Sequence, residues 1–136
     1  MAQQTIGMTR VAQRTAASKL NANFNELYDR VVSTTNAAIT AAGSFVVPAG
    51  YAITQLYIVN NNANAVTGGL KFGTAAGGTQ VVTAQAVAAN AIVAVADSAV
   101  TLRLFSKTVA QTVYFDAVTA WNGANVDIVA IMRKVF

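Results

Sequence analysis

The chain has 136 residues, of which 54% are hydrophobic and 10% charged, and its net charge is +4. This length suits one domain with a hydrophobic core and is short for two. The sequence contains neither Cys nor His, which excludes disulfides and removes the most common metal ligands and the most common general base. We therefore expect no cofactor, and the low charge density indicates that other subunits cover part of the surface.

Neither the apolar nor the basic residues are grouped as a membrane or nucleic-acid partner would require. The most apolar region, 81–95, is interrupted by polar residues, whereas a membrane helix needs roughly 18 to 20 apolar residues. The first part of the chain lacks the apolar core of a signal peptide. Nucleic-acid binding requires clustered Lys and Arg, and the densest group here is only Arg10, Arg14 and Lys19. We expect a soluble chain with neither partner.

The N-terminal part predicts an arm followed by a helix. Residues 1–14 have no periodicity, and their Gln, Thr and Gly content indicates an extended arm that orders on a partner. Thr15 is a suitable N-cap for a helix that runs to about residue 33, and 33–43 is a fraying continuation or a linker. Gaps that alternate between three and four give the a/d pattern of a coiled coil at Ala17, Leu20, Phe24, Leu27, Val31, Thr34 and Ala38.

This seam must be buried, because the middle of the helix contains three asparagines, which are poor helix formers. The pattern is consistent with two partners: the chain's own sheet, or further copies of the chain. We favour the second, a trimeric coiled coil with its oligomer interface at Leu20, Phe24, Leu27 and Val31.

After Gly43 the pattern changes to the period of two that is typical of strands. In 51–59, Ala52, Thr54, Leu56 and Ile58 are expected on one face and Ile53, Gln55, Tyr57 and Val59 on the other. Both faces are fairly apolar, so one is expected to meet a neighbouring subunit. Gly68 and Gly69 are expected to form a hairpin turn.

Strand-like runs separated by turn residues predict the architecture of the C-terminal part. The expected strands are 44–47, 51–59, 70–73, 80–84, 92–96, 99–105, 112–119 and 126–135. About eight strands at intervals of roughly ten residues indicate an antiparallel sandwich or barrel, and eight favours a jelly roll. The predicted fold is therefore mainly β, with an anchoring arm at 1–14, a helical segment and linker at 15–43, and a β-sandwich at 44–136.

Few residues in the chain can carry catalysis. Asp116 and Asp127 fall on predicted neighbouring strands and could face each other as a glycosidase pair, but no supporting polar cleft is evident and a structural role is favoured. No serine has a histidine to activate it. The segment 73–80, GTAAGGTQ, superficially resembles a phosphate loop but lacks the Lys-Ser/Thr ending, which favours a hairpin turn. We expect no enzymatic activity.

Trp121 lies at a predicted turn and has two interpretations. It either contacts a sugar or a partner, or closes the end of the sandwich core. A carbohydrate-binding domain would use Trp121, Tyr114 and the Asn-rich loop 60–64.

Two parts of the sequence resemble a known class of proteins. Residues 18–31, SKLNANFNELYDRV, resemble a short helical motif near the start of many tailed-bacteriophage structural proteins, especially fibre and fibre-like components. Residues 48–82 and 116–128 resemble small phage virion proteins that carry a compact β domain. The resemblance implies a homotrimer in the virion that attaches by its N-terminal part, displays a β domain outward and has no catalytic residues. The absence of a long repetitive shaft favours a short decoration or fibre.

These observations predict a non-enzymatic virion structural protein, assembled in the host cytoplasm. It would be a homotrimeric capsid decoration or short head-fibre protein, bound to the major capsid protein or another virion component. Arg10, Arg14 and Lys19 are the expected anchoring residues. The alternative is a tail-fibre or adaptor component whose β domain binds a host-surface glycan through Trp121 and Tyr114.

Overall fold

The computed structural model of the chain describes residues 31–95 and 106–135, and this part is mainly β, as predicted. The strands are β1 (Val31–Ile39), β2 (Gly43–Val47), β3 (Tyr51–Asn60), β4 (Val66–Gly73), β5 (Val82–Val87), β6 (Ile92–Ala94), β7 (Gln111–Ala117) and β8 (Val126–Lys134). Within these residues, no helix has the length and hydropathy needed to cross a membrane.

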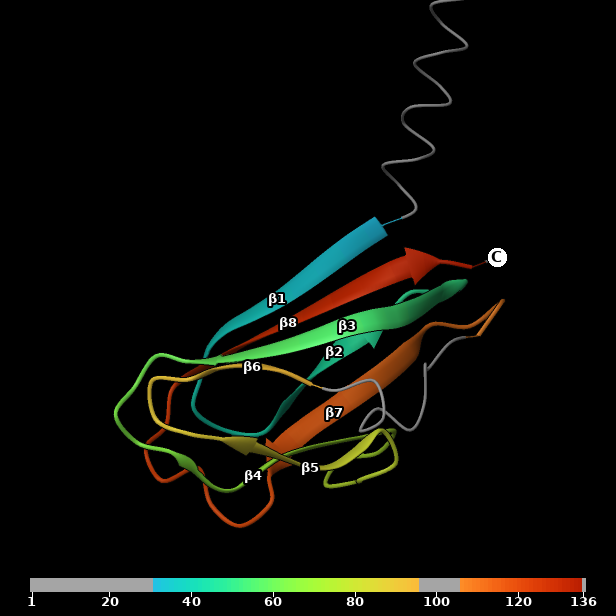
Figure 1. The fold of residues 1–136 in the computed structure, drawn as a ribbon. Helices are drawn as coiled ribbons and strands as arrows, with labels where there is room; N and C mark the ends of the chain where they lie inside the picture. The colour runs from blue at the N-terminus through green and yellow to red at the C-terminus, as the bar shows by residue number, and fades with distance from the viewer. Residues whose placement is uncertain (1–30, 96–105, 136) are drawn as a thin grey trace, which may run out of the picture. The chain divides into compact units, whose positions relative to one another are not determined.

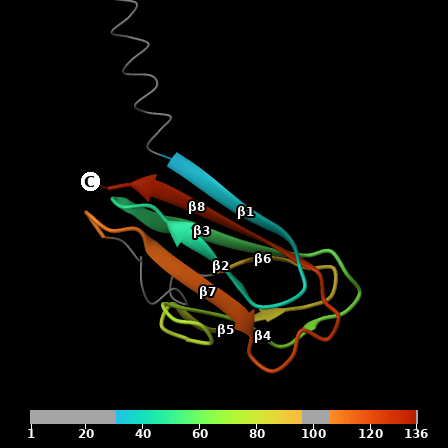
Figure 2. The same ribbon diagram turned by 180° about the vertical axis from the view of Figure 1, so that it is seen from behind.

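The strands form two antiparallel four-stranded sheets, seen from opposite sides in Figures 1 and 2. Sheet A has the order β1-β8-β3-β6, and sheet B has the order β2-β7-β4-β5. Apart from β4 and β5, each strand is followed in the chain by a strand of the other sheet. Residues that are close in sequence therefore often lie on different sheets, which matters for the candidate site.

The core consists of side chains from alternate positions of both sheets, as expected for strands with one buried face. In β8, buried and half-buried residues alternate from Val126 to Met132. The rings of Phe72 and Phe115 lie with their centroids 6.4 Å apart and tilted by 56°, within the range that favours aromatic pairs. Each large apolar side chain buried in this way contributes about 1.5–3 kcal/mol.

The strand predicted at 51–59 is present as β3, but its predicted faces are partly wrong. The pairing of β3 with β8 shifts between Ile53 and Gln55, so Thr54 is an extra residue. The Thr54 hydroxyl donates to the Ile131 carbonyl oxygen at 3.1 Å. Ile53 consequently joins Leu56 in the core, because a bulge reverses the phase of the alternation.

The two glycines predicted to form a hairpin turn, Gly68 and Gly69, lie inside β4. Their φ angles are +80° and +83°, and the pairing of β4 with β5 is irregular here. A Cβ at Gly69 would overlap the carbonyl oxygen of Gln85 on β5. The glycines thus let neighbouring backbone segments approach β4 closely. Besides forming turns, glycine commonly has this role inside strands.

The segment 33–43, predicted as a fraying helix or linker, contains most of β1, which pairs with β8 in sheet A. The sequence of β1, VVSTTNAAI, is rich in β-branched residues, which favour strands. The seam positions Thr34 and Ala38 lie in this strand, and Val31 is its first residue. The continuation of the helical seam from Val31 onward is therefore wrong, while the role of Val31 in an oligomer interface stays a prediction.

Several predictions concern residues outside the described ranges and stay predictions. They are the arm at 1–14, the helix that begins at 15, the interface residues Leu20, Phe24 and Leu27, the anchoring residues Arg10, Arg14 and Lys19, and the strand at 99–105.

Candidate functional site

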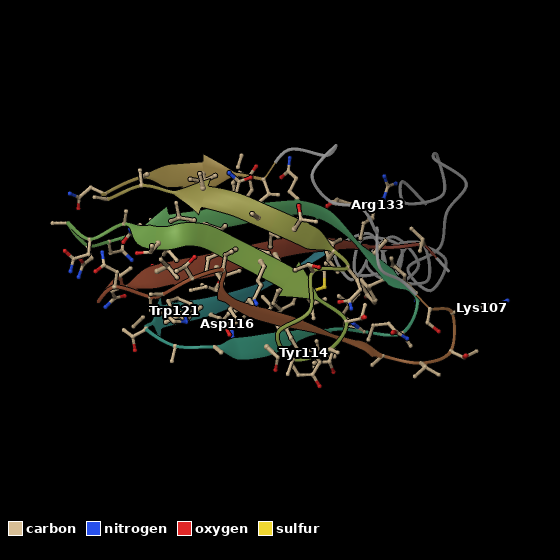
Figure 3. The ribbon with its side chains drawn as sticks, turned by 90° about the horizontal axis from the view of Figure 1, so that it is seen from below. Lys107, Tyr114, Asp116, Trp121 and Arg133 are labelled. Atoms are coloured by element: carbon tan, nitrogen blue, oxygen red, sulfur yellow. The ribbon has the colours of Figure 1, made fainter. Side chains whose placement is uncertain are left out.

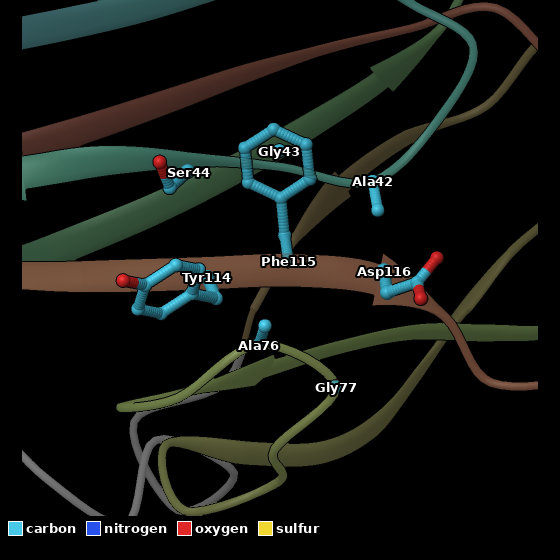
Figure 4. Close-up of a pocket in the computed structure, with 8 residues that line it drawn as sticks. All are labelled: Ala42, Gly43, Ser44, Ala76, Gly77, Tyr114, Phe115 and Asp116. Atoms are coloured by element: carbon cyan, nitrogen blue, oxygen red, sulfur yellow. The ribbon is translucent and has the colours of Figure 1, made fainter.

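The outer face of sheet B carries a pocket of about 280 Å³ (Figure 4). It is lined by Ala42, Gly43, Ser44, Ala76, Gly77, Tyr114, Phe115 and Asp116. Tyr114 and Asp116 are two residues apart on β7, so they share the outer face, while Phe115 between them is only 3% exposed and belongs to the core. Ser44 on β2 is the register partner of Tyr114. The pocket therefore combines a phenol, a carboxylate and a hydroxyl.

The β4–β5 loop forms one side of this pocket because Gly73 has no side chain. Gly73 is the register partner of Tyr114 on β4, and a Cβ there would overlap both the backbone of Gly78 and the side chain of Gln80. The side-chain oxygen of Gln80 accepts a hydrogen bond from the Thr74 N–H at 3.0 Å, which holds the loop. The sequence GTAAGGTQ connects two antiparallel strands, so its interpretation as a hairpin connection is confirmed.

Hydrogen bonds fix the Asp116 carboxylate. Its Oδ1 accepts from the Trp121 indole N–H at 2.9 Å and from the Ala117 backbone N–H at 2.8 Å. Trp121 is half-buried and packs against the core, and Figure 3 shows it next to Asp116. Its indole nitrogen is therefore engaged within the chain. Tyr114 lies further along β7, where its ring borders the pocket between Ser44 and Ala76 (Figure 4).

A lysine lies opposite this carboxylate on the neighbouring strand. Lys71 on β4 is the register partner of Asp116, so both half-buried side chains project from the outer face of sheet B. Opposite charges that face each other across antiparallel strands stabilise a sheet by about 0.2–1 kcal/mol. The surroundings of the pocket thus have no excess of either charge at this position.

The two carboxylates considered as a glycosidase pair lie on different sheets. Asp116 is on β7 of sheet B and Asp127 is on β8 of sheet A, so the strands predicted as neighbours are not paired. Both oxygens of Asp127 are occupied: Oδ1 accepts from the Ala38 N–H at 2.8 Å, and Oδ2 accepts from the Asn61 side chain at 2.9 Å. The two carboxylates of a glycosidase flank one bond, and these residues do not form that arrangement.

The Asn-rich β3–β4 loop is also bound within the chain. Asn60 is only 2% exposed, and its side-chain nitrogen donates to the carbonyl oxygens of Asn64 at 2.8 Å and Ala88 at 3.0 Å. The side-chain nitrogen of Asn62 donates to the Gly123 carbonyl oxygen at 3.1 Å. These bonds connect three loops, β3–β4, β5–β6 and β7–β8. They satisfy buried polar groups, which indicates a structural role for these amides.

The outer face of sheet A has a different character. Tyr57 and Val129 are register partners and half-buried, with the half-buried Ile131 next along β8. On β6 at the edge, Ile92 is 77% exposed. The apolar outer face predicted for the strand at 51–59 is therefore present, except that the bulge has moved Ile53 to the core.

Sequence reasoning identified Tyr114 but not the group around it. The spacing of Tyr114 and Asp116 could have indicated one shared face, but Ser44 and the loop beyond Gly73 reach the pocket only through sheet pairing. No group of three acidic side chains among the described residues could hold a metal ion. Comparisons with known proteins give no match to this chain, whether with family models, with curated proteins or with solved structures.

Proposed function

We propose that the chain is a non-enzymatic structural component of a bacteriophage particle, with a β domain of the jelly-roll type. The observation that carries this proposal is the pairing of β1 with β8, β2 with β7, β3 with β6 and β4 with β5. One long antiparallel ribbon wrapped around a core has these pairs, and a jelly roll is such a ribbon. Viral capsid and lectin domains use this architecture.

The position that we propose is that of a homotrimeric capsid decoration or short head-fibre protein, anchored through its N-terminal region to the major capsid protein or another virion component. The resemblance of residues 18–31 to the helical motif of phage structural proteins supports this position. A trimer would bury the seam residues Leu20, Phe24 and Leu27.

The outer face of sheet A supports association of subunits as well. Tyr57, Val129 and Ile131 form an apolar row there, and Ile92 at the edge of the sheet is 77% exposed. Burial of apolar area between subunits is a main source of association energy, at roughly 25 cal/mol per Å² before the costs of association.

The solution mass of the full chain tests the trimer. Native mass spectrometry and light scattering at micromolar concentration are expected to give three times the 14.1 kDa of one chain. A mass equal to one chain would overturn the proposal.

Charges placed in the seam test which segment holds the trimer. The variant Leu20→Glu with Phe24→Glu is expected to be monomeric, while circular dichroism still reports the β domain. The control Ala22→Glu with Asn25→Glu adds the same two charges at outward positions of the heptad and should remain trimeric. A trimeric seam variant would remove the coiled coil from the proposal.

One observation favours a second candidate, a tail-fibre or adaptor component whose β domain binds a glycan. This observation is the pocket beside Tyr114 and Asp116.

A further inference from the structure

We propose that the pocket on the outer face of sheet B binds a neutral sugar ring, with Tyr114 as the aromatic surface and Asp116 and Ser44 as the hydrogen-bonding groups. This inference goes beyond the virion role, since it depends neither on the position of the chain in a particle nor on the trimer. It keeps Tyr114 from the sequence-based hypothesis but replaces Trp121 and the Asn-rich loops with Asp116 and Ser44 as the other contacts.

The groups around the pocket match the two kinds of surface on a sugar. A pyranose presents C–H groups on its faces, and these pack against the electron-rich face of an aromatic ring such as that of Tyr114. Its hydroxyls lie around the edge and need both donors and acceptors. The Asp116 carboxylate accepts strongly, and the Ser44 hydroxyl both donates and accepts.

The carboxylate is held in place before a ligand binds. Trp121 and the Ala117 N–H donate to Oδ1 of Asp116, and no described residue donates to Oδ2. A fixed acceptor with one open oxygen loses little conformational freedom on binding, which favours affinity. Trp121 therefore contributes by orienting Asp116, not by stacking on the ligand.

The charges around the pocket favour a neutral ligand. Lys71 is opposite Asp116 in the sheet, so the two opposite charges offset each other for an approaching anion as well as for a cation. A neutral polyol needs no net charge at the site and binds through hydrogen bonds and ring packing.

The loop side of the pocket leaves room for a ring. The loop presents only the methyl group of Ala76 and the backbone of Gly77 there, and a Cβ at Gly77 would have no atom within 4 Å. A lining of apolar and aromatic groups with a few polar groups is typical of ligand sites.

Saturation-transfer difference NMR on the full chain tests this site. The probes are the methyl glycosides of glucose, galactose, mannose, rhamnose and N-acetylglucosamine at millimolar concentration, with tetramethylammonium as a cationic probe. We expect transfer to the ring protons of at least one glycoside. Absence of transfer to all five glycosides overturns the proposal, as does transfer to tetramethylammonium alone.

Variants locate the binding. Tyr114→Ala is expected to weaken binding at least tenfold, and Asp116→Asn and Ser44→Ala about fivefold each, as for a lost hydrogen bond. The matched controls Asp127→Asn and Tyr57→Phe, on the outer face of sheet A, should bind like the parent. Unchanged binding in folded Asp116→Asn and Ser44→Ala overturns the proposal even if Tyr114→Ala fails to fold.

The test of the sugar site and the test of the trimer have independent outcomes. A monomeric chain that binds a glycoside through Tyr114 would overturn the trimer and keep the site. A trimer that binds none of the five glycosides would do the reverse.

Discussion

The outer faces of the two sheets differ, although both sheets contribute to one core. The outer face of sheet A carries an apolar row that includes Tyr57, Val129 and Ile131. The outer face of sheet B carries Tyr114 and Asp116 beside a pocket. Their inner faces are interchangeable in character, because both only need to bury apolar area. The outer faces therefore indicate function. The apolar row on sheet A suits contact with another protein, and the polar pocket on sheet B suits a small ligand.

The largest change in stability is expected from a substitution in the core, because both sheets share this core and both outer faces depend on it. Phe72 is fully buried and packs on Phe115. Phe72→Ala should lower the free energy of unfolding by about 3–5 kcal/mol, through lost burial and the cavity left behind. Chemical denaturation measures this value. The control Val46→Ala, at a position that is 51% exposed, should change it by less than about 0.5 kcal/mol.

Gly73→Ala should damage the outer face of sheet B and leave that of sheet A intact. The added methyl overlaps the backbone of Gly78, so the loop must move, at an expected cost of about 1–3 kcal/mol. Gly77→Asn is the matched control, because its Cβ has open space and Asn tolerates the φ of +75°. Denaturation curves for both variants test this expectation, and equal losses of stability would contradict it.

One charge placed on either outer face compares the two faces directly. Ile92→Asp on sheet A should weaken self-association at least tenfold, whereas Val46→Asp on sheet B should leave it unchanged. Both side chains are largely exposed, so neither variant should change the stability of the folded chain by more than about 0.5 kcal/mol. Sedimentation equilibrium measures the association. Equal weakening by the two variants would assign the contact to no particular face.

The smallest of these effects is expected from loss of the hydrogen bond between the Trp121 indole and the Asp116 carboxylate. Trp121→Phe keeps an aromatic ring against the core but removes the N–H that Asp116 accepts, at a cost of about 1 kcal/mol. A double-mutant cycle with Asp116→Asn isolates this bond and should give a coupling of at least about 0.5 kcal/mol. Strict additivity of the two changes would show that the bond contributes nothing to stability.

Local pattern predicted much of the fold but not the site. Period-two alternation located β2, β3, β7 and β8 to within a few residues, because one face of each strand is buried. Seven of the eight predicted strands correspond to β2–β8, the eighth at 99–105 lies outside the described residues, and β1 was missed in favour of a helical continuation. The pocket depends on contacts between distant segments, such as Ser44 with Tyr114, and local alternation contains no information about such pairs.

The sequence by itself determined that the chain lacks thiol and imidazole chemistry and that its described part is mainly β, since composition and alternation are local properties. Only the tertiary structure decided the rest. A bulge at Thr54 placed Ile53 in the core, and the crossing from β7 to β8 separated Asp116 from Asp127. Both outcomes follow from which strands pair and in which register. The packing of the whole core sets that register, and no single segment can specify it.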